Sequence, residues 1–227
     1  SKMALKYPGT TMTLLANLVV IMSAHFGESC LAWMRSLPDD YMTSKQTVSY
    51  AGLFDDVGAD AWYASSVDYV KYGRLMYNLF QPDAQMTRAM FAQVLYALEG
   101  SPSVRGLSCP FTDAGGSWYT DAVIWAYHAG VVAGVSATQF APNEALTREQ
   151  MVTMLYGYAG RDEQLYGSDG ALASYQDQAS VSDWAREAMA WAVSTGVITG
   201  TSTTTLAPQK IGTRAEVATV LMQFCEQ

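Results

Sequence analysis

Apolar residues recur at helical spacing in several segments of the chain. The run 122–129 is mostly apolar and ends at Gly130, and the run 188–193 is followed by Gly196. A glycine after the last periodic residue favours a helix end, because glycine adopts the left-handed conformation at little cost. Small residues four positions apart in each run would let helix backbones approach closely. The pattern predicts a helix in each run and favours packing of these helices, with a third near Ser66, around one pseudo-threefold axis.

A second set of helices is predicted to begin at three Thr-Arg pairs. Thr213 and Glu216 fit the capping box, in which the hydroxyl accepts from the amide three residues later and the acid accepts from the cap amide. Thr147 and Gln150 fit the same pattern. Thr87 is followed by a methionine at that position, so the first of these helices keeps the cap and loses the box.

The first 50 residues contain a third pattern. Apolar residues recur at steps of three and four from Leu15 to Leu37, which predicts an amphipathic helix within an N-terminal segment 1–50 of unknown role. Two lysines ahead of an apolar stretch are also compatible with a secretory signal, and both interpretations stay open. The longest apolar stretch, 14–24, is shorter than the roughly 20 residues that a bilayer requires, so we expect no membrane span.

The two kinds of helix belong to a repeat that occurs three times. Each copy has an aromatic-x-Asp start, a tryptophan, an apolar-x-Pro segment and, after four more residues, Thr-Arg. Three matches in the same order indicate a repeat architecture. We assign residues 51–106, 107–168 and 169–227 to the three copies. The shared positions are Asp56, Asp113 and Asp177; Trp62, Trp118 and Trp184; Thr87, Thr147 and Thr213; and Arg88, Arg148 and Arg214.

Composition excludes two classes of protein. The chain has 227 residues, of which 50% are hydrophobic and 15% charged, and this excludes a disordered chain because such chains are poor in hydrophobic residues. The net charge is −8, with 13 Lys and Arg against 21 Asp and Glu. Generic nucleic-acid binding needs an excess of cations, so no nucleic-acid partner is expected.

Catalysis finds no support in the sequence. It contains no Gly-x-Ser-x-Gly, His-Glu-x-x-His, phosphate-loop or Cys-x-x-Cys motif. The two histidines, His25 and His128, lie in unrelated segments, and the acid pairs are adjacent residues, which rarely converge on one bond. We therefore expect no enzyme, no cofactor and no metal site. Three cysteines allow at most one intramolecular disulfide.

The repeats resemble the S-layer homology (SLH) family. The signature of that family has an aromatic-x-Asp start, a tryptophan, a Gly-apolar-apolar-x-Gly element, apolar-x-Pro and a final Thr-Arg-Ala-Glu. Here the final element reads Thr-Arg-Ala-Met at 87–90, Thr-Arg-Glu-Gln at 147–150 and Thr-Arg-Ala-Glu at 213–216. The resemblance covers residues 53–227 and leaves the first 50 residues unexplained.

The resemblance implies a fold and a function. Members of the family usually carry three copies folded as a three-pronged spindle, so we expect a mostly α protein with a pseudo-threefold arrangement, a central helix bundle and an additional N-terminal helix. Members anchor extracellular proteins to the wall of Gram-positive bacteria by binding secondary cell-wall polysaccharide, often through a pyruvate ketal. The resemblance therefore implies an extracellular location at the cell surface or wall, with this polysaccharide as partner.

The arginines of the Thr-Arg pairs occupy an unfavourable position. The dipole of a helix disfavours a cation in the first turn and favours an anion. An external anion such as a pyruvyl carboxylate would resolve the conflict, if guanidinium groups and free helix amides held it together. The alternative is an internal partner, an aspartate of a neighbouring repeat, and both stay open. The residues expected to lock the repeats together are Asp56, Asp113, Asp177, Thr87, Thr147, Thr213 and Glu216.

The tryptophans and two glycines are similarly ambiguous. A tryptophan beside an anion site offers a stacking surface for a sugar, but a tryptophan at a helix entry more often belongs to the core, and we favour the core. Gly134 and Gly200 either offer open amides to a ligand or simply form tight turns. The first repeat lacks these glycines and is shorter near 77–79, so a groove built from it is expected to be altered. The candidate ligand-binding residues are Arg148, Arg214, Arg88, Gly134, Gly200, Trp118 and Trp184.

The sequence thus predicts a non-catalytic module that binds cell-wall polysaccharide and anchors a surface protein to a bacterial envelope. The alternative is a degenerate SLH scaffold used for protein–protein interaction, with residues 1–50 as a possible site for a protein partner. The loss of the terminal acid from two of the three Thr-Arg motifs favours that alternative. A third hypothesis is that the chain is a fragment of a larger surface enzyme.

Overall fold

The computed structural model describes residues 56–58, 60–67, 81–160 and 170–225. The predicted N-terminal helix, the alternative signal segment and the short loop near 77–79 lie outside these residues, as do His25 and Cys30. The described chain is mostly helical, and it contains isolated β-bridges but no longer strand. Its α-helices are α5 (Arg88–Leu98), α6 (Thr120–His128), α7 (Arg148–Ala159), α8 (Arg186–Ser194) and α9 (Arg214–Cys225), with a further helical turn at 64–67.

The Thr-Arg helices begin as predicted. The Thr147 hydroxyl accepts from the Gln150 amide and the Gln150 side chain accepts from the Thr147 amide, so α7 has a complete capping box. Thr213 and Glu216 make the same two hydrogen bonds at the start of α9. Thr87 accepts from the third amide of α5 and has no box. Substituting such a cap costs a helix about 1 kcal/mol, so these threonines fix where the three helices begin.

Helices α6 and α8 confirm the prediction for the two apolar runs. Each is followed closely by the expected glycine, and both glycines have a positive φ, 71° at Gly130 and 78° at Gly196. These left-handed residues turn the chain away from the helix axis, which leads it into the loop before the next Thr-Arg helix.

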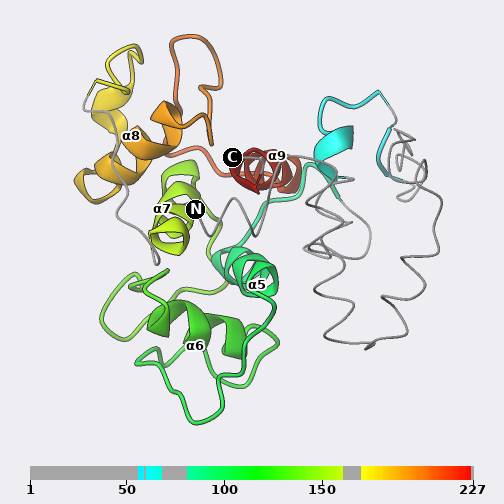
Figure 1. The fold of residues 1–227 in the computed structure, drawn as a ribbon, viewed down its shortest axis with the longest axis vertical. Helices are drawn as coiled ribbons and strands as arrows, with labels where there is room; N and C mark the ends of the chain where they lie inside the picture. Colours follow the sequence, from blue (N-terminus) through cyan, green and yellow to red (C-terminus); the bar gives the residue numbers. More distant parts are fainter. Residues whose placement is uncertain (1–55, 59, 68–80, 161–169, 226–227) are drawn as a thin grey trace, which may run out of the picture.

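Helices α5, α7 and α9 lie next to one another in the middle of the described chain, with α6 and α8 outside them (Figure 1). Their inward side chains, among them Phe91, Leu95, Leu155 and Leu221, are fully buried. Tyr158 of α7 contacts Phe224 of α9, and the ring centroids are 6.0 Å apart. The hydrophobic core therefore follows the three Thr-Arg helices. This central position was predicted for the other set of helices, and that part of the prediction is wrong.

The outer helices pack across the expected repeat boundaries. Helix α6 packs on α5 of the preceding repeat, and α8 packs on α7. Ala122 and Ala126 are fully buried in α6, so their small size does permit close approach, but the partner helix is α5. At the helical turn 64–67, Ser66 meets α9, where Thr219 Oγ1 donates to Ser66 Oγ at 3.1 Å. Each Thr-Arg helix is thus contacted by a segment from another repeat.

A closed ring of backbone hydrogen bonds joins the three repeats. The amide of Leu146 donates to the carbonyl of Met86 at 2.8 Å, and the amide of Gly212 donates to Leu146 at 2.9 Å. The amide of Met86 closes the ring by donating to Gly212 at 3.1 Å. All three residues lie just ahead of a Thr-Arg pair. The ring fixes the starts of α5, α7 and α9 relative to one another, while the expected threefold symmetry of the whole domain stays a prediction.

Candidate functional site

The apolar-x-Pro segments have a strained backbone in all three repeats. Their middle residues have positive φ values, 50° at Gln81, 58° at Ala141 and 53° at Ala207. This left-handed conformation costs a residue with a side chain about 1–2 kcal/mol, so other interactions have to hold the segment in place. In this protein those interactions come from the repeated aspartates and arginines.

Asp177 holds the segment of the third repeat from its amide side. Its two carboxylate oxygens accept from the amides of Leu206 and Ala207, at 2.8 and 2.7 Å. The hydrogen bond from Leu206 is the main influence on the pKa of Asp177; the Ala207 amide and Arg148 act in the same direction against burial, so the pKa is lowered. The aromatic-x-Asp start therefore stabilises the left-handed residue of the same repeat.

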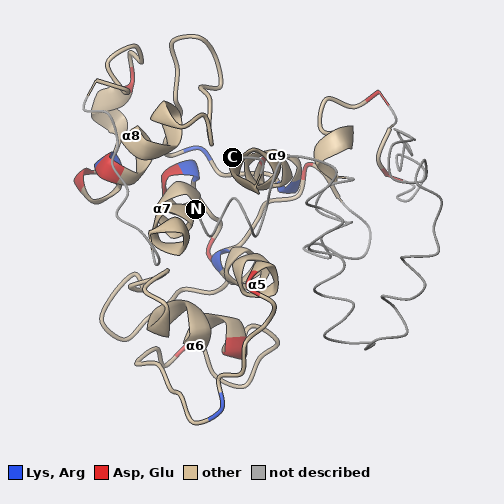
Figure 2. Cartoon of the chain, viewed as in Figure 1, with Lys and Arg blue, Asp and Glu red and all other residues tan. Residues whose placement is uncertain are grey.

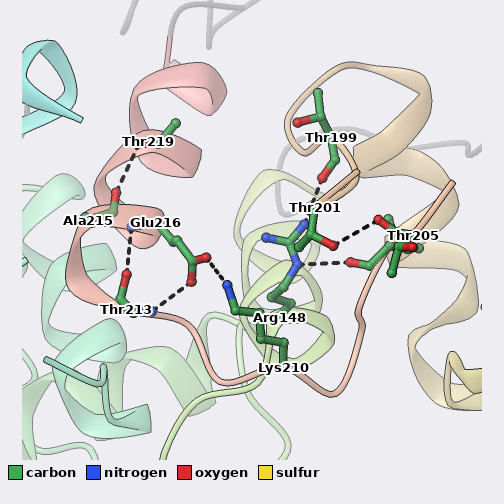
Figure 3. Close-up of polar contacts among 10 residues, drawn as sticks. Arg148, Thr199, Thr201, Thr205, Lys210, Thr213, Ala215, Glu216 and Thr219 are labelled. Atoms are coloured by element: carbon green, nitrogen blue, oxygen red, sulfur yellow. Dashed lines mark hydrogen bonds and ion pairs between the residues drawn. The ribbon is translucent and has the colours of Figure 1, made fainter. Parts of the chain in front are cut away.

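Arg148 holds the same segment from its carbonyl side. Its Nε donates to the Leu206 carbonyl at 3.2 Å and its Nη2 donates to the Thr199 carbonyl at 2.8 Å. Figure 3 shows the guanidinium group pointing into the loop that carries Thr199, Thr201 and Thr205. Arg148 is only 6% exposed. An arginine of the second repeat is thus built into a loop of the third.

The same arrangement of aspartate, strained segment and arginine occurs at the junction between the first and second repeats. Asp113 accepts from the amides of Phe140 and Ala141, at 2.9 and 2.8 Å. Burial alone would raise the pKa of Asp113, but these two hydrogen bonds, with help from Arg88, lower it overall. Arg88 donates from Nε to the Phe140 carbonyl at 2.9 Å, and its guanidinium carbon lies 4.9 Å from the centre of the Phe140 ring. This geometry is that of a cation–π contact.

Arg214 closes the cycle toward the first repeat. It is half-buried; burial lowers the pKa of its guanidinium group, and the nearby charge of Asp56 opposes that effect. Asp56 accepts a hydrogen bond from the amide of Gln81, the left-handed residue of the first repeat. The charge of an aspartate of the neighbouring repeat acts on each of the three arginines. Arg88 and Arg148 donate to backbone carbonyls of the segment that this aspartate also binds. Direct pairing of arginine and aspartate stays a prediction.

The amides at the starts of the central helices are already occupied. Figure 2 shows basic residues at the first turns of α5, α7 and α9, where free amides were expected to hold an external anion. Instead, the first two amides of each helix donate to carbonyls of another repeat at 2.9–3.0 Å. The expectation of free helix amides is therefore wrong. The pairs are Arg88 with Glu144, Ala89 with Pro142, Arg148 with Lys210, Glu149 with Pro208, Arg214 with Ala84 and Ala215 with Pro82.

The third repeat carries the one capping acid. Glu216 accepts from the Thr213 amide and is in contact with the ammonium group of Lys210, as Figure 3 shows. Burial is the largest influence on Glu216 and would raise its pKa, but the bonds from Lys210 and Thr213 lower it overall. The carbonyl of Lys210 also accepts a hydrogen bond from the Arg148 amide. Lys210 therefore joins the cap of α9 to the start of α7.

The repeated tryptophans are exposed. Trp62, Trp118 and Trp184 have 67%, 61% and 56% of their surface accessible, so the core interpretation is wrong for all three. Trp118 contacts Tyr119 edge-to-face with ring centroids 5.1 Å apart, and the Tyr119 ring is buried. Trp118 and Trp184 thus present their rings to solvent directly ahead of a buried residue, Tyr119 and Ala185.

Gly134 and Gly200 are required by tight turns. A Cβ atom at Gly134 would lie 2.4 Å from the Phe111 ring and 2.7 Å from two backbone oxygens. A Cβ atom at Gly200 would lie 2.3 Å from the carbonyl oxygen of Ser202. The amides that follow Gly200, those of Thr201 and Ser202, donate to the Thr205 carbonyl, and the equivalent amides after Gly134 also bond within their turn. The two amides that follow each glycine are therefore used within the turn.

Glu149 is a residue that the sequence analysis did not single out. It lies in the first turn of α7 and is 2% exposed. Its carboxylate accepts from the amide of Ser182 at 3.0 Å, from the Ser182 hydroxyl at 2.8 Å and from the Gln209 side chain at 2.7 Å. A signal was present in the sequence, since the equivalent positions of the other repeats are Ala89 and Ala215.

Two further expectations concern absences. Among the described residues, no group of three or more His, Cys, Asp or Glu side chains could hold a metal ion, and no helix is long and apolar enough to cross a membrane. His128 lies at the exposed end of α6, and its Nε2 is 2.8 Å from the Ser108 carbonyl. His128 is therefore a surface residue whose ring contacts a backbone carbonyl.

The family model of the S-layer homology domain matches residues 110–152 and 174–218. These matches fall in the second and third repeats, and each runs from an aromatic-x-Asp start through the following Thr-Arg pair. In these two repeats the aspartate, the strained segment and the Thr-Arg cap of the following helix all lie within the regions matched by the S-layer homology model.

Relatives of known description include surface proteins and enzymes. The chain is 29% identical over 185 residues to the S-layer protein sap of Bacillus anthracis, 28% over 185 residues to the exoglucanase XynX of Acetivibrio thermocellus, and 30% over 191 residues to an endoglucanase of Bacillus sp. strain KSM-635. These alignments cover 79%, 81% and 78% of this chain but only 22%, 17% and 19% of the relatives. The chain thus spans less than a quarter of each relative, and the enzymes share with it a small part of their length.

Proposed function

We propose that this chain is a non-catalytic module that binds secondary cell-wall polysaccharide and anchors a surface protein to the envelope of a Gram-positive-type bacterium. The observation that carries the proposal is the exposure of one tryptophan per repeat, at 56–67%, on a buried and hydrogen-bonded frame. A large aromatic ring held in solvent costs hydrophobic free energy, so a ligand that stacks on it explains its position. The S-layer homology matches supply the class of ligand.

The proposed site centres on the exposed rings of Trp118 and Trp184, with the turns at Gly134 and Gly200 shaping the loops around them. Arg88 and Arg148 are buried and support the site from inside. The half-buried Arg214 is the arginine best able to meet an acidic sugar substituent such as a pyruvate ketal. The first repeat, with Trp62, completes the proposed set of three S-layer homology repeats.

The test compares retention of the full chain on purified pyruvylated wall polymer and on the same polymer stripped of its ketals. We expect the doubly substituted Trp118→Ala, Trp184→Ala chain to lose about tenfold or more in affinity, because each ring contributes stacking energy of about 1 kcal/mol. Leu107→Ala is the matched control, since Leu107 is also an exposed apolar residue. Unchanged retention of the double variant would overturn the assignment of the site.

The protein-interaction scaffold stays the second candidate. The observation in its favour is the replacement of the terminal acid by Met90 and Gln150 in two of three motifs. Exposed tryptophans also anchor protein partners well. Equal or absent retention on the two polymer preparations would favour the scaffold over the anchor.

A further inference from the structure

The second and third repeats are joined by a buried carboxylate. The carboxylate of Glu149 in α7 accepts hydrogen bonds from the backbone amide and the hydroxyl of Ser182. It also accepts one from the side chain of Gln209. Gln209 in turn lies within hydrogen-bond distance of the Ser180 carbonyl at 3.3 Å. Ser182 stands two residues ahead of Trp184. The loop that presents the exposed ring of the third repeat is thus fixed by a side chain of the second.

The equivalent loop of the second repeat is held differently. There the Ser117 amide, next to Trp118, donates to the Thr120 hydroxyl at 2.9 Å, and that hydroxyl donates to the Ala114 carbonyl at 2.8 Å. Both bonds join the loop to the first residue of α6 in the same repeat. The position equivalent to Glu149 is Ala89, whose methyl group offers no hydrogen bond. Two exposed tryptophans in equivalent positions therefore stand on unequal supports.

We infer that Glu149 is a positioning residue that preorganises Trp184, so that the junction between the second and third repeats is the preferred site for the polysaccharide. This inference rests on the proposed function. A side chain or loop that is ordered before binding loses less conformational entropy on binding, which increases the affinity. The buried carboxylate accepts two hydrogen bonds from Ser182 and one from Gln209, which orders the loop ahead of Trp184. Among the described residues, the loop ahead of Trp118 has no hydrogen bond of this kind from a side chain of another repeat.

A double-mutant cycle tests the inference in the full chain. Glu149→Ala, which creates the residue type found in the other two repeats, is expected to weaken binding of pyruvylated wall polymer about three- to tenfold, in line with the entropy of ordering one loop. The effect should vanish in a Trp184→Ala background and persist in a Trp118→Ala background, because Glu149 acts through Trp184 alone. Glu149→Gln should recover part of the affinity, and Glu144→Ala, which removes an exposed acid, should change nothing.

Amide hydrogen exchange provides a readout that needs no ligand. The Ser182 amide should exchange about tenfold faster or more in Glu149→Ala, since it loses its acceptor, and should be unchanged in Glu144→Ala. If Ser182 stays protected in Glu149→Ala, or if the loss of affinity persists without Trp184, the inference is wrong. If the unmodified chain is not retained on the polymer, the proposed function fails, and the exchange of Ser182 alone decides whether Glu149 fixes the loop.

Discussion

Arg148 and Asp177 bind the same residue, Leu206, from opposite sides. The carboxylate of Asp177 accepts from the Leu206 amide at 2.8 Å, while Arg148 donates to the Leu206 carbonyl at 3.2 Å. The two charged residues come from different repeats, and the residue after Leu206 has the left-handed backbone. The charges of two motifs that are far apart in sequence are therefore used together to hold one strained turn.

Loss of Arg148 should destabilise the fold. Arg148→Ala is expected to lower the free energy of unfolding by about 3 kcal/mol, because two charge-assisted hydrogen bonds disappear and the buried Leu206 carbonyl loses its donor. Urea denaturation followed by circular dichroism measures this change. Arg186→Ala removes an exposed arginine and should cost less than about 0.5 kcal/mol. Equal stability of the two variants would show that Arg148 is not part of the frame.

Relief of the backbone strain should stabilise the protein. Ala207 has a φ of 53°, which glycine adopts more readily than alanine. Ala207→Gly is expected to raise the free energy of unfolding by about 0.5–1 kcal/mol, because the strain removed exceeds the added entropy of the unfolded chain. Ala137→Gly, at an exposed residue without a positive φ, should be neutral or destabilising. A loss of stability in Ala207→Gly would contradict the account of the turn.

The low pKa of Asp177 predicts how stability depends on pH. A carboxylate whose pKa is lowered by folding contributes stability above its unfolded value, about 3.9, and that contribution is lost as the pH falls through the folded value. Asp177→Asn should therefore be less stable at pH 7, and its stability should depend less on pH below about 4. Thermal unfolding from pH 2 to 7 measures both effects. Asp183→Asn, at an exposed residue, serves as control and should follow the unmodified chain.

Close packing of α7 predicts an unfavourable effect of a helix-forming residue. A Cβ atom at Gly157 would lie 3.0 Å from the Gly130 carbonyl oxygen and 3.1 Å from the Cα of Val131, both of which are backbone atoms. Gly157→Ala should therefore lower the melting temperature, although alanine is favoured over glycine in a helix by about 1 kcal/mol. Gly115→Ala, where the added atom meets nothing within 4 Å, should have little effect. A higher melting temperature for Gly157→Ala would show that the neighbouring backbone moves aside.

Local interactions were predictable from the sequence, and contacts between repeats were not. The capping box of Thr147 and Gln150 spans three residues, so its residue types and spacing predict it directly. The central position of α5, α7 and α9 depends on which helix packs on which, and the apolar spacing of both sets of helices is compatible with either arrangement. The alanines of α6 correctly indicated that another helix packs closely against α6, but they could not indicate that this helix is α5.

The candidate site shows the same division. The charge on Arg148 and its unfavourable place in a helix were visible in the sequence, but its partners, Thr199 and Leu206, are 51 and 58 positions away. Exposure of Trp184 depends on which face of the loop meets solvent, and no local spacing encodes that. Glu149 differs from the alanines of its sister repeats, and this difference was the one available sign of its role.

The contact between Ser66 and Thr219 joins residues that are 153 positions apart. A nascent chain that lacks α9 cannot make this contact, because Thr219 lies within α9. The described part therefore needs α9 to complete its contacts, and distant contacts of this kind have a high loop-closure entropy. A product truncated before α9 would lack the contact between Ser66 and Thr219 and the buried side chains of α9, and so it should be recognisable to proteases as an incompletely folded chain.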